Sequence, residues 1–168
     1  MAERASRTTV AHLCAALDSG ELVLERDGLR GRFASRVAVV ALDEGLDEEG
    51  AADSLLDRLA LAVDLHMVGI HDVDDPRYSG ADIEAARRLL PAVTCTPTQL
   101  QTLAGVAISL GVDSPRALLL ANRATRAIAA LAGRDNVIDD DLAAATRLAL
   151  AHRATRLPLP EEVEDEPE

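Results

Sequence analysis

The spacing of hydrophobic residues changes several times along the first 70 positions of the chain. Residues 10–17 (VAHLCAAL) repeat apolar side chains at helical spacing, and the Asp-Ser-Gly sequence at 18–20 ends that pattern. Residues 21–26 and 29–33 flank an Asp-Gly pair, which accepts the positive φ angles of a two-residue type I′ turn. The pattern therefore predicts a short helix followed by a β-hairpin.

Two continuous apolar runs follow, at 36–42 (RVAVVAL) and 61–67 (LAVDLHM). Runs of this kind are typical of strands that are covered on both faces of a sheet. Between them lie an acidic, glycine-containing loop at 43–53 and a short helix predicted at 54–59. Strand, helix and strand in this order predict a parallel α/β layer, with 36–42 as a central strand.

The chain from position 79 onward has helical periodicity. Ser114 and Pro115 are suited to the N-cap and the first position of a helix, where a missing N–H costs little. The aspartates at 139–141 favour the N-terminus of another helix. The predicted helices, which together would form a bundle, are 81–90, 97–110, 115–131 and 140–152.

Charge, hydropathy and cysteine content exclude some classes of function and favour one cellular compartment. All 17 basic residues are arginines, against 29 acidic residues and a net charge of −12, which argues against a nucleic-acid partner because phosphates require a basic surface. No apolar run approaches the roughly 18 residues of a membrane-spanning helix. Cys14 and Cys95 lie in apolar surroundings without metal-ligand spacing, which favours buried thiols in a reducing cytosol. We therefore expect a cytoplasmic protein.

Much of the negative charge lies at the C-terminal end. Residues 161–168 contain six acids and no base, which accounts for half of the net charge of −12. Pro158, Pro160 and Pro167 accompany these acids. We interpret residues 157–168 as an extended, self-repelling linker toward a further domain.

Two motifs bear on metal and nucleotide chemistry. Residues 71–75 (HDVDD) lack the glycine and distal glutamate of a calcium loop and the spacing of a zinc site, so we interpret them as a solvated acidic loop. No metal site is expected. The chain also contains no GxxxxGKS/T phosphate loop and no lysine. By itself it should not hydrolyse ATP.

Two arginines are candidates for anion contacts. Arg58 follows the short helix between the two predicted strands, at a sheet edge from which a guanidinium could reach a phosphate in a neighbouring subunit. Arg116 lies in the first turn of a predicted helix, where N–H groups and a cation together favour an anion. On the residues alone, each is more often an ordinary surface or helix-end arginine.

A longer stretch of the chain resembles the AAA+ module of magnesium chelatase. Residues 19–58 (SGELVLERDGLRGRFASRVAVVALDEGLDEEGAADSLLDR) are similar to its hairpin of the form GE-x-x-VERDGL, its sensor 1 strand and its LLDR segment. The similarity continues through 86–93 (ARRLLPAV) and through 110–127 (LGVDSPRALLLANRATRA), which resembles the sensor 2 helix of the lid. It covers most of residues 10–156.

The resemblance implies roles for three residues. Arg58 would be the arginine finger that acts in trans on the ATP of the adjacent subunit, and Arg116 would be the sensor 2 arginine. Asp43 stands where the motor subunit has its sensor 1 asparagine. A carboxylate would repel a γ-phosphate, which places this chain with the degenerate D-type subunits rather than with the motor.

The same resemblance implies partners, a cofactor and a reaction. The D subunit works with a hexameric ring of I subunits and with the H subunit, and ATP with Mg²⁺ is expected at the interface with the motor. The complex is an ATP-dependent ligase that inserts Mg²⁺ into protoporphyrin IX during bacteriochlorophyll and chlorophyll synthesis. This chain would be a non-hydrolysing scaffold that offers Arg58.

The resemblance also predicts the domain organisation. Residues 1–70 would be the C-terminal part of an AAA+ P-loop-type α/β domain, 71–156 the helical lid and 157–168 the linker. In an AAA+ sheet the phosphate-loop strand lies between the strands expected at 36–42 and 61–67, and this chain lacks it. Because these two strands cannot pair without it, we expect an excerpt of a longer protein that is ordered in an assembly. A sharp two-state melt of the isolated monomer would contradict this.

Two other functions stay open. One is an active AAA+ ATPase, either the I subunit or a MoxR-like chaperone, which a phosphate loop and a Walker B glutamate upstream of Met1 would favour. The other is a helical interaction module without a nucleotide role, which failure to associate with any AAA+ ring would favour.

Overall fold

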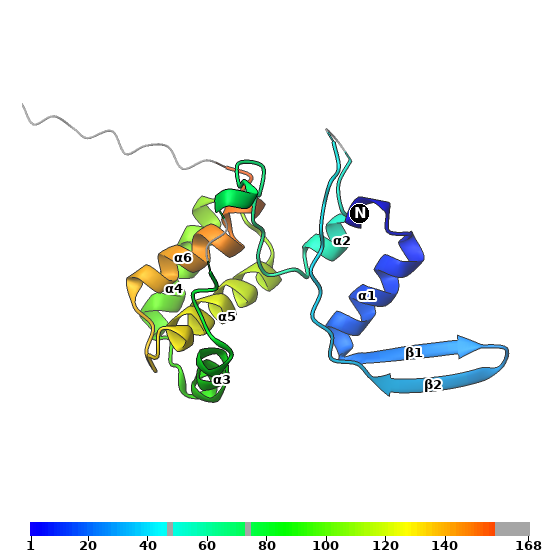
Figure 1. The fold of residues 1–168 in the computed structure, drawn as a ribbon, viewed down its shortest axis with the longest axis horizontal. Coiled ribbons are helices and arrows are strands. Elements are labelled where there is room, and N and C mark those ends of the chain that lie inside the picture. The colour runs from blue at the N-terminus through cyan, green and yellow to red at the C-terminus, as the bar shows by residue number, and fades with distance from the viewer. Residues whose placement is uncertain (47–48, 73–74, 157–168) are drawn as a thin grey trace, which may run out of the picture. The chain divides into compact units, whose positions relative to one another are not determined.

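The structure is a computed structural model that describes residues 1–46, 49–72 and 75–156 (Figure 1). The chain divides into two compact units, Met1–Leu59 and the part that starts at Ala60. Each unit has a hydrophobic core of its own.

The first unit begins with the one-turn 3-10 helix η1 (Ala2–Arg4) and the helix α1 (Arg7–Ser19). Ser6 caps α1 because its Oγ accepts a hydrogen bond from the Thr9 N–H at 3.1 Å. Gly20 ends the helix with a φ of 67°, a left-handed conformation that glycine adopts without steric cost. The helix predicted at 10–17 is confirmed and is longer at both ends.

The predicted hairpin is also confirmed (Figure 1). Strands β1 (Glu21–Arg26) and β2 (Leu29–Ala34) pair antiparallel, with Leu22 opposite Phe33. The turn residues Asp27 and Gly28 have φ angles of 53° and 79°, as a type I′ turn requires.

A small core joins α1 to the short helix α2 (Asp53–Leu56), which occupies part of the helix predicted at 54–59. Val10, Cys14 and Leu55 are buried against one another, and Leu13, Leu17 and Leu59 pack on them. This core fixes the position of α2 relative to α1.

The strands predicted at 36–42 and 61–67 are not formed. The hairpin is the one sheet among the described residues, so the parallel α/β layer predicted from 36–42 and 61–67 is not present in that part of the chain. Val40 in the first segment is 86 % exposed and Met67 in the second 93 % exposed. A strand needs a neighbouring strand for its N–H and C=O groups, and the described residues form none beside these segments. Each segment has an isolated backbone bond instead: the Leu42 carbonyl accepts from Ala2, and the Ala62 N–H donates to Leu148.

The second unit is helical, as its periodicity predicts. Three of its helices begin at capped residues: Ser79 and Thr96 each form a reciprocal capping box, and Ser114 accepts the Ala117 N–H at 3.3 Å. The described elements are η2 (Ile70–Asp72), α3 (Gly80–Leu89), η3 (Leu90–Ala92), α4 (Pro97–Ser109), α5 (Pro115–Leu131), α6 (Asp139–Ala149) and η4 (Ala151–Arg153).

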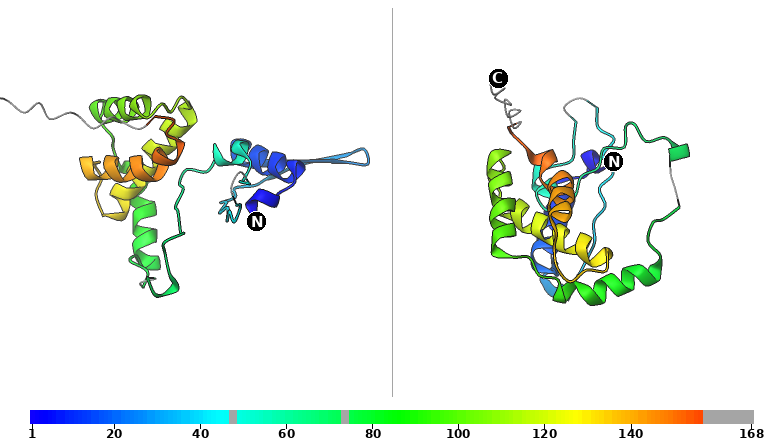
Figure 2. Two further views of the ribbon diagram at one scale, coloured as in Figure 1. Left: turned by 90° about the horizontal axis from the view of Figure 1, so that it is seen from above. Right: turned by 90° about the vertical axis from the view of Figure 1, so that its left-hand side faces the viewer.

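The core of this unit is built largely from alanines. Small side chains at a helix contact allow the two helix axes to approach closely. Figure 2 shows the helices from Gly80 to Ala149, coloured green to orange, from two further directions. The fully buried alanines on α5 and α6 are Ala117, Ala121, Ala129, Ala145 and Ala149.

Within the described ranges, no helix is long and apolar enough to cross a membrane.

Candidate functional site

Arg58, the predicted finger, lies one residue beyond the C-cap of α2 and pairs with the end of α1. Its Nε and Nη2 both donate to one oxygen of Asp18, at 3.0 Å and 2.5 Å. Its Nη1 donates to the Ser54 carbonyl at 2.6 Å. The guanidinium is thus held by a carboxylate from α1 and a carbonyl from α2.

The electrostatics of this pair follow from its geometry. The hydrogen bonds that Arg58 donates to Asp18 raise the pKa of Arg58 above its ordinary value, so the guanidinium stays charged. The side chain of Arg58 is 19 % exposed and that of Asp18 is 36 % exposed, so the pair lies at the surface.

A cleft of about 470 Å³ adjoins Arg58. Ser54 and Arg58 line one part of it and the apolar face of α1 another, and Arg7 adds a second cation. The Cys14 thiol at this cleft donates to the same Ser54 carbonyl at 3.4 Å. The arrangement presents two arginines beside an otherwise mainly apolar surface.

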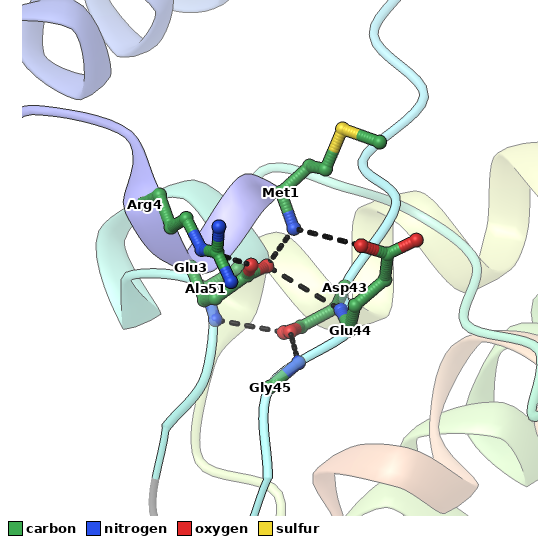
Figure 3. A network of polar contacts seen from close by, with 7 residues as sticks. All are labelled: Met1, Glu3, Arg4, Asp43, Glu44, Gly45 and Ala51. Atoms are coloured by element: carbon green, nitrogen blue, oxygen red, sulfur yellow. Dashed lines mark hydrogen bonds and ion pairs between the residues drawn. The ribbon is translucent and has the colours of Figure 1, made fainter.

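Asp43, predicted as the degenerate sensor 1 residue, holds a loop together (Figure 3). One carboxylate oxygen accepts the Gly45 N–H at 3.0 Å and the other accepts the Ala51 N–H at 2.8 Å. In the same network the N-terminal ammonium pairs with Glu3 and lowers the pKa of its carboxyl to about 2. Asp43 therefore stabilises the loop that precedes α2, and Arg58 follows that helix.

Arg116, predicted as the sensor 2 residue, is the second residue of α5 and is half-buried. Ser114 caps this helix and Pro115 is its first residue, as predicted. Arg116 belongs to the second unit, whereas Arg58 and Asp43 belong to the first. Neither compact unit therefore contains all three predicted residues.

Sequence reasoning missed three strong polar contacts. Asp18, expected only as a helix breaker, is the partner of Arg58, 40 positions away. In the lid, Arg134 forms two bonds of 2.7 Å with the two oxygens of the buried Asp141. Arg126 on α5 donates to the carbonyls of Val93 and Leu90, which lie at the two ends of η3, at 3.0 Å and 3.1 Å. Motif spacing gives no signal for such pairs, because the partners are distant or lie across a turn.

The acidic segment at 71–75 is only partly described. Asp72 accepts the Gly69 N–H at 2.7 Å, whereas Val73 and Asp74 lie outside the described residues. No cluster of three His, Cys, Asp or Glu side chains arranged for a metal ion occurs within the part of the chain that the structure describes.

Comparison with known proteins gives similarity over the whole chain. A family model described as an AAA lid domain matches residues 100–168. The "Magnesium-chelatase 60 kDa subunit" of Cereibacter sphaeroides is 38 % identical over 169 residues, which cover 100 % of this chain and 27 % of that protein. The "Magnesium-chelatase 67 kDa subunit" of Chlorobaculum parvum is 33 % identical over 90 % of this chain and 27 % of its own length.

The chain is a homologue of the magnesium-chelatase AAA+ subunits. The similarity extends to the "Magnesium-chelatase 38 kDa subunit" of Rhodobacter capsulatus, which is 36 % identical over 85 % of this chain and 47 % of its own length. The homologue described here spans about a quarter of the length of the 60 kDa and 67 kDa proteins. The AAA lid match covers most of α4 and all of α5 and α6.

Proposed function

We propose that this chain is the AAA+ portion of a D-type magnesium-chelatase subunit, a scaffold that does not itself hydrolyse ATP. Its partners would be a hexameric ring of I subunits and the porphyrin-binding H subunit, in the cytoplasm. The complex would act as an ATP-dependent ligase that inserts Mg²⁺, as a substrate, into protoporphyrin IX. The observation that carries the proposal is the similarity of the whole chain to the 60 kDa subunit.

The fold proposed for the first unit follows from the same relationship. The segments 36–42 and 61–67 would become strands when a further segment of an AAA+ sheet lies between them. Their exposed apolar side chains, such as Val40 and Met67, support this proposal because a covered strand of a sheet is rich in such residues.

Two of the three predicted residues fit a nucleotide phosphate at a subunit interface. Arg58 is a charged guanidinium at the surface, and such a group matches phosphate oxygens in geometry. Arg116 lies in the first turn of α5, where backbone N–H groups favour an anion. ATP bound at that interface would supply the free energy for metal insertion.

Asp43 does not fit the role of a sensor 1 asparagine. Its two oxygens accept backbone N–H groups of its own loop, and a carboxylate has no N–H with which to hold a γ-phosphate or a water molecule. This supports the proposed scaffold role, in which the partner subunit would hydrolyse ATP.

The decisive experiment replaces the proposed finger. Arg58→Ala should lower the rate of Mg²⁺ insertion by the reconstituted complex about tenfold or more, because an arginine finger contributes on the order of 10³-fold to kcat. Insertion is followed by the fluorescence of the metallated porphyrin, and assembly by size-exclusion chromatography.

Arg30→Ala is the matched control. Arg30 is an exposed arginine of the same unit, and it pairs with Glu25 on the hairpin at 2.8 Å. The control should leave both insertion and assembly unchanged. An Arg58→Ala complex that assembles and inserts Mg²⁺ at the wild-type rate would refute the proposal.

The alternative function is an active motor, either the I subunit or a related chaperone. The similarity to the 38 kDa subunit favours this alternative, since the chain covers 47 % of that protein. ATP hydrolysis by the purified protein in the absence of any partner subunit would establish it and would overturn the scaffold role.

A further inference from the structure

The contacts of Arg58 with Asp18 and Ser54 do not use all of its N–H donors. An arginine has five N–H donors in a planar fork. The contacts to Asp18 and Ser54 use three of them, one each on Nε, Nη1 and Nη2. Within the described residues, these contacts therefore leave a second N–H on Nη1 and a second N–H on Nη2, and a phosphate can accept hydrogen bonds from such groups.

The contact with Asp18 fixes the plane of this fork. A single oxygen, Oδ2, accepts from both Nε and Nη2, and the Ser54 carbonyl holds Nη1. Because the guanidinium is rigid and planar, three bonds to two fixed acceptors define its orientation. Both acceptors come from helices whose side chains meet in the small core, α1 and α2.

The location of Asp18 is unusual for an acidic residue. It lies in the last turn of α1, where the carbonyl groups of the helix end repel a negative charge. The local cost is offset by the ion pair with Arg58. Helix stability alone therefore does not explain an aspartate at this position.

We propose that Asp18 is the positioning residue for the finger: it holds the Arg58 guanidinium so that the Nη1 and Nη2 edge faces a phosphate of a nucleotide bound by a neighbouring subunit. This inference rests on the proposed function. Loss of Asp18 leaves Arg58 attached through Nη1 alone, and the fork then samples orientations that do not present two N–H groups together. The effect falls on kcat, because the misplaced group stabilises the transition state and not the binding of ATP.

The test uses the reconstituted complex and measures kcat and KM for ATP in Mg²⁺ insertion. Asp18→Ala should lower kcat about tenfold and change KM for ATP less than about twofold, since misplacement of a catalytic group by about 1 Å costs up to roughly a hundredfold. Asp18→Asn keeps an oxygen acceptor and should lose less than Asp18→Ala. Glu25→Gln is the matched control, because it removes another arginine–carboxylate pair of the same unit.

A double variant separates positioning from a merely structural role. In the Arg58→Ala background, Asp18→Ala should cause no further loss of kcat. Equal losses of kcat from Asp18→Ala in the wild-type and the Arg58→Ala backgrounds would overturn the inference. An unchanged or raised kcat in the Asp18→Ala single variant would overturn it too. If Arg58→Ala itself leaves insertion unchanged, the proposed function fails; if Arg58→Ala is slow and Asp18→Ala is as fast as wild type, only the positioning role fails.

Discussion

The pair formed by Arg134 and Asp141 at the start of α6 offers the sharpest test of what stabilises the lid. Asp141 is 2 % exposed and accepts three hydrogen bonds, two from Arg134 at 2.7 Å and one from the Ile138 N–H at 3.0 Å. Asp141→Asn replaces one acceptor oxygen by an NH₂ group that faces the donors of Arg134. The substitution changes charge and bonding with almost no change in volume.

The expected cost follows from the burial of the two partners. Breaking a buried ion pair by removal of one partner costs about 3–5 kcal/mol. Here the Arg134 side chain is 28 % exposed and can reach water, which reduces the penalty. We expect Asp141→Asn to lower the free energy of unfolding of the lid by about 2–3 kcal/mol, since one charge-assisted hydrogen bond alone contributes roughly 1.5–3 kcal/mol.

Urea denaturation followed by far-UV circular dichroism measures this loss, and hydrogen exchange of the α6 amides assigns it to the lid. Asp140→Asn is the matched control, because Asp140 occupies the same helical turn and is exposed. That control should cost about 1 kcal/mol or less, the usual contribution of an acid near a helix N-terminus. Equal costs for the two variants would refute the reasoning, because burial and bonding would then contribute nothing beyond charge.

The pair of Arg134 and Asp141 also makes the stability of the lid depend on pH. The hydrogen-bonded guanidinium of Arg134 lowers the pKa of Asp141 below its ordinary value. A carboxyl group with a lowered folded pKa contributes stability that is present above the unfolded pKa of about 3.9 and is lost as pH falls through the folded pKa. The stability difference between wild type and Asp141→Asn should therefore shrink as the pH is lowered from about 4 toward 2. A difference that stays constant over this range would contradict the assignment.

Two backbone positions give further predictions. Gly111→Ala should lower the Tm of the lid more than Gly133→Ala does. Both glycines have a positive φ, so the backbone strain is similar. A Cβ at Gly111 would collide with Thr155, whereas a Cβ at Gly133 meets no atom within 4 Å. Equal shifts in Tm would show that the collision is relieved without cost. Gly28→Ala should weaken the hairpin by about 1–2 kcal/mol because its φ of 79° is left-handed, and faster hydrogen exchange of the β1 and β2 amides would report it. Unchanged protection of those amides would contradict this prediction.

Much of the local structure could be predicted because its signals are local. Gly20 and the Asp27-Gly28 pair each fix a chain reversal through their own φ angles. Ser114 and Pro115 place the start of α5 at the predicted residue. In these places the side chain that carries the information touches the backbone that it shapes, so the sequence alone is sufficient.

The strands predicted at 36–42 and 61–67 are not formed, because the contacts that complete a strand are not local. The run at 36–42 has the composition of a buried strand, but a strand is completed by hydrogen bonds to a neighbour that composition does not specify. Val37 and Val40 are exposed where a covered strand would bury them. Apolar β-branched content therefore predicts a tendency to join a sheet, and the formation of that sheet depends on what is present beside it.

Arg58, the proposed finger, shows how much of a site a sequence motif can predict. The LLDR segment at 55–58 identifies Arg58 by resemblance, yet the carboxylate that orients its guanidinium comes from α1, 40 positions earlier. The small core that joins α1 to α2 keeps Asp18 within reach. The proposed finger therefore depends on the last turn of α1 as well as on the motif. Substitutions in the core that shift α1, such as Leu55→Ala, should therefore impair the proposed trans activity without touching Arg58.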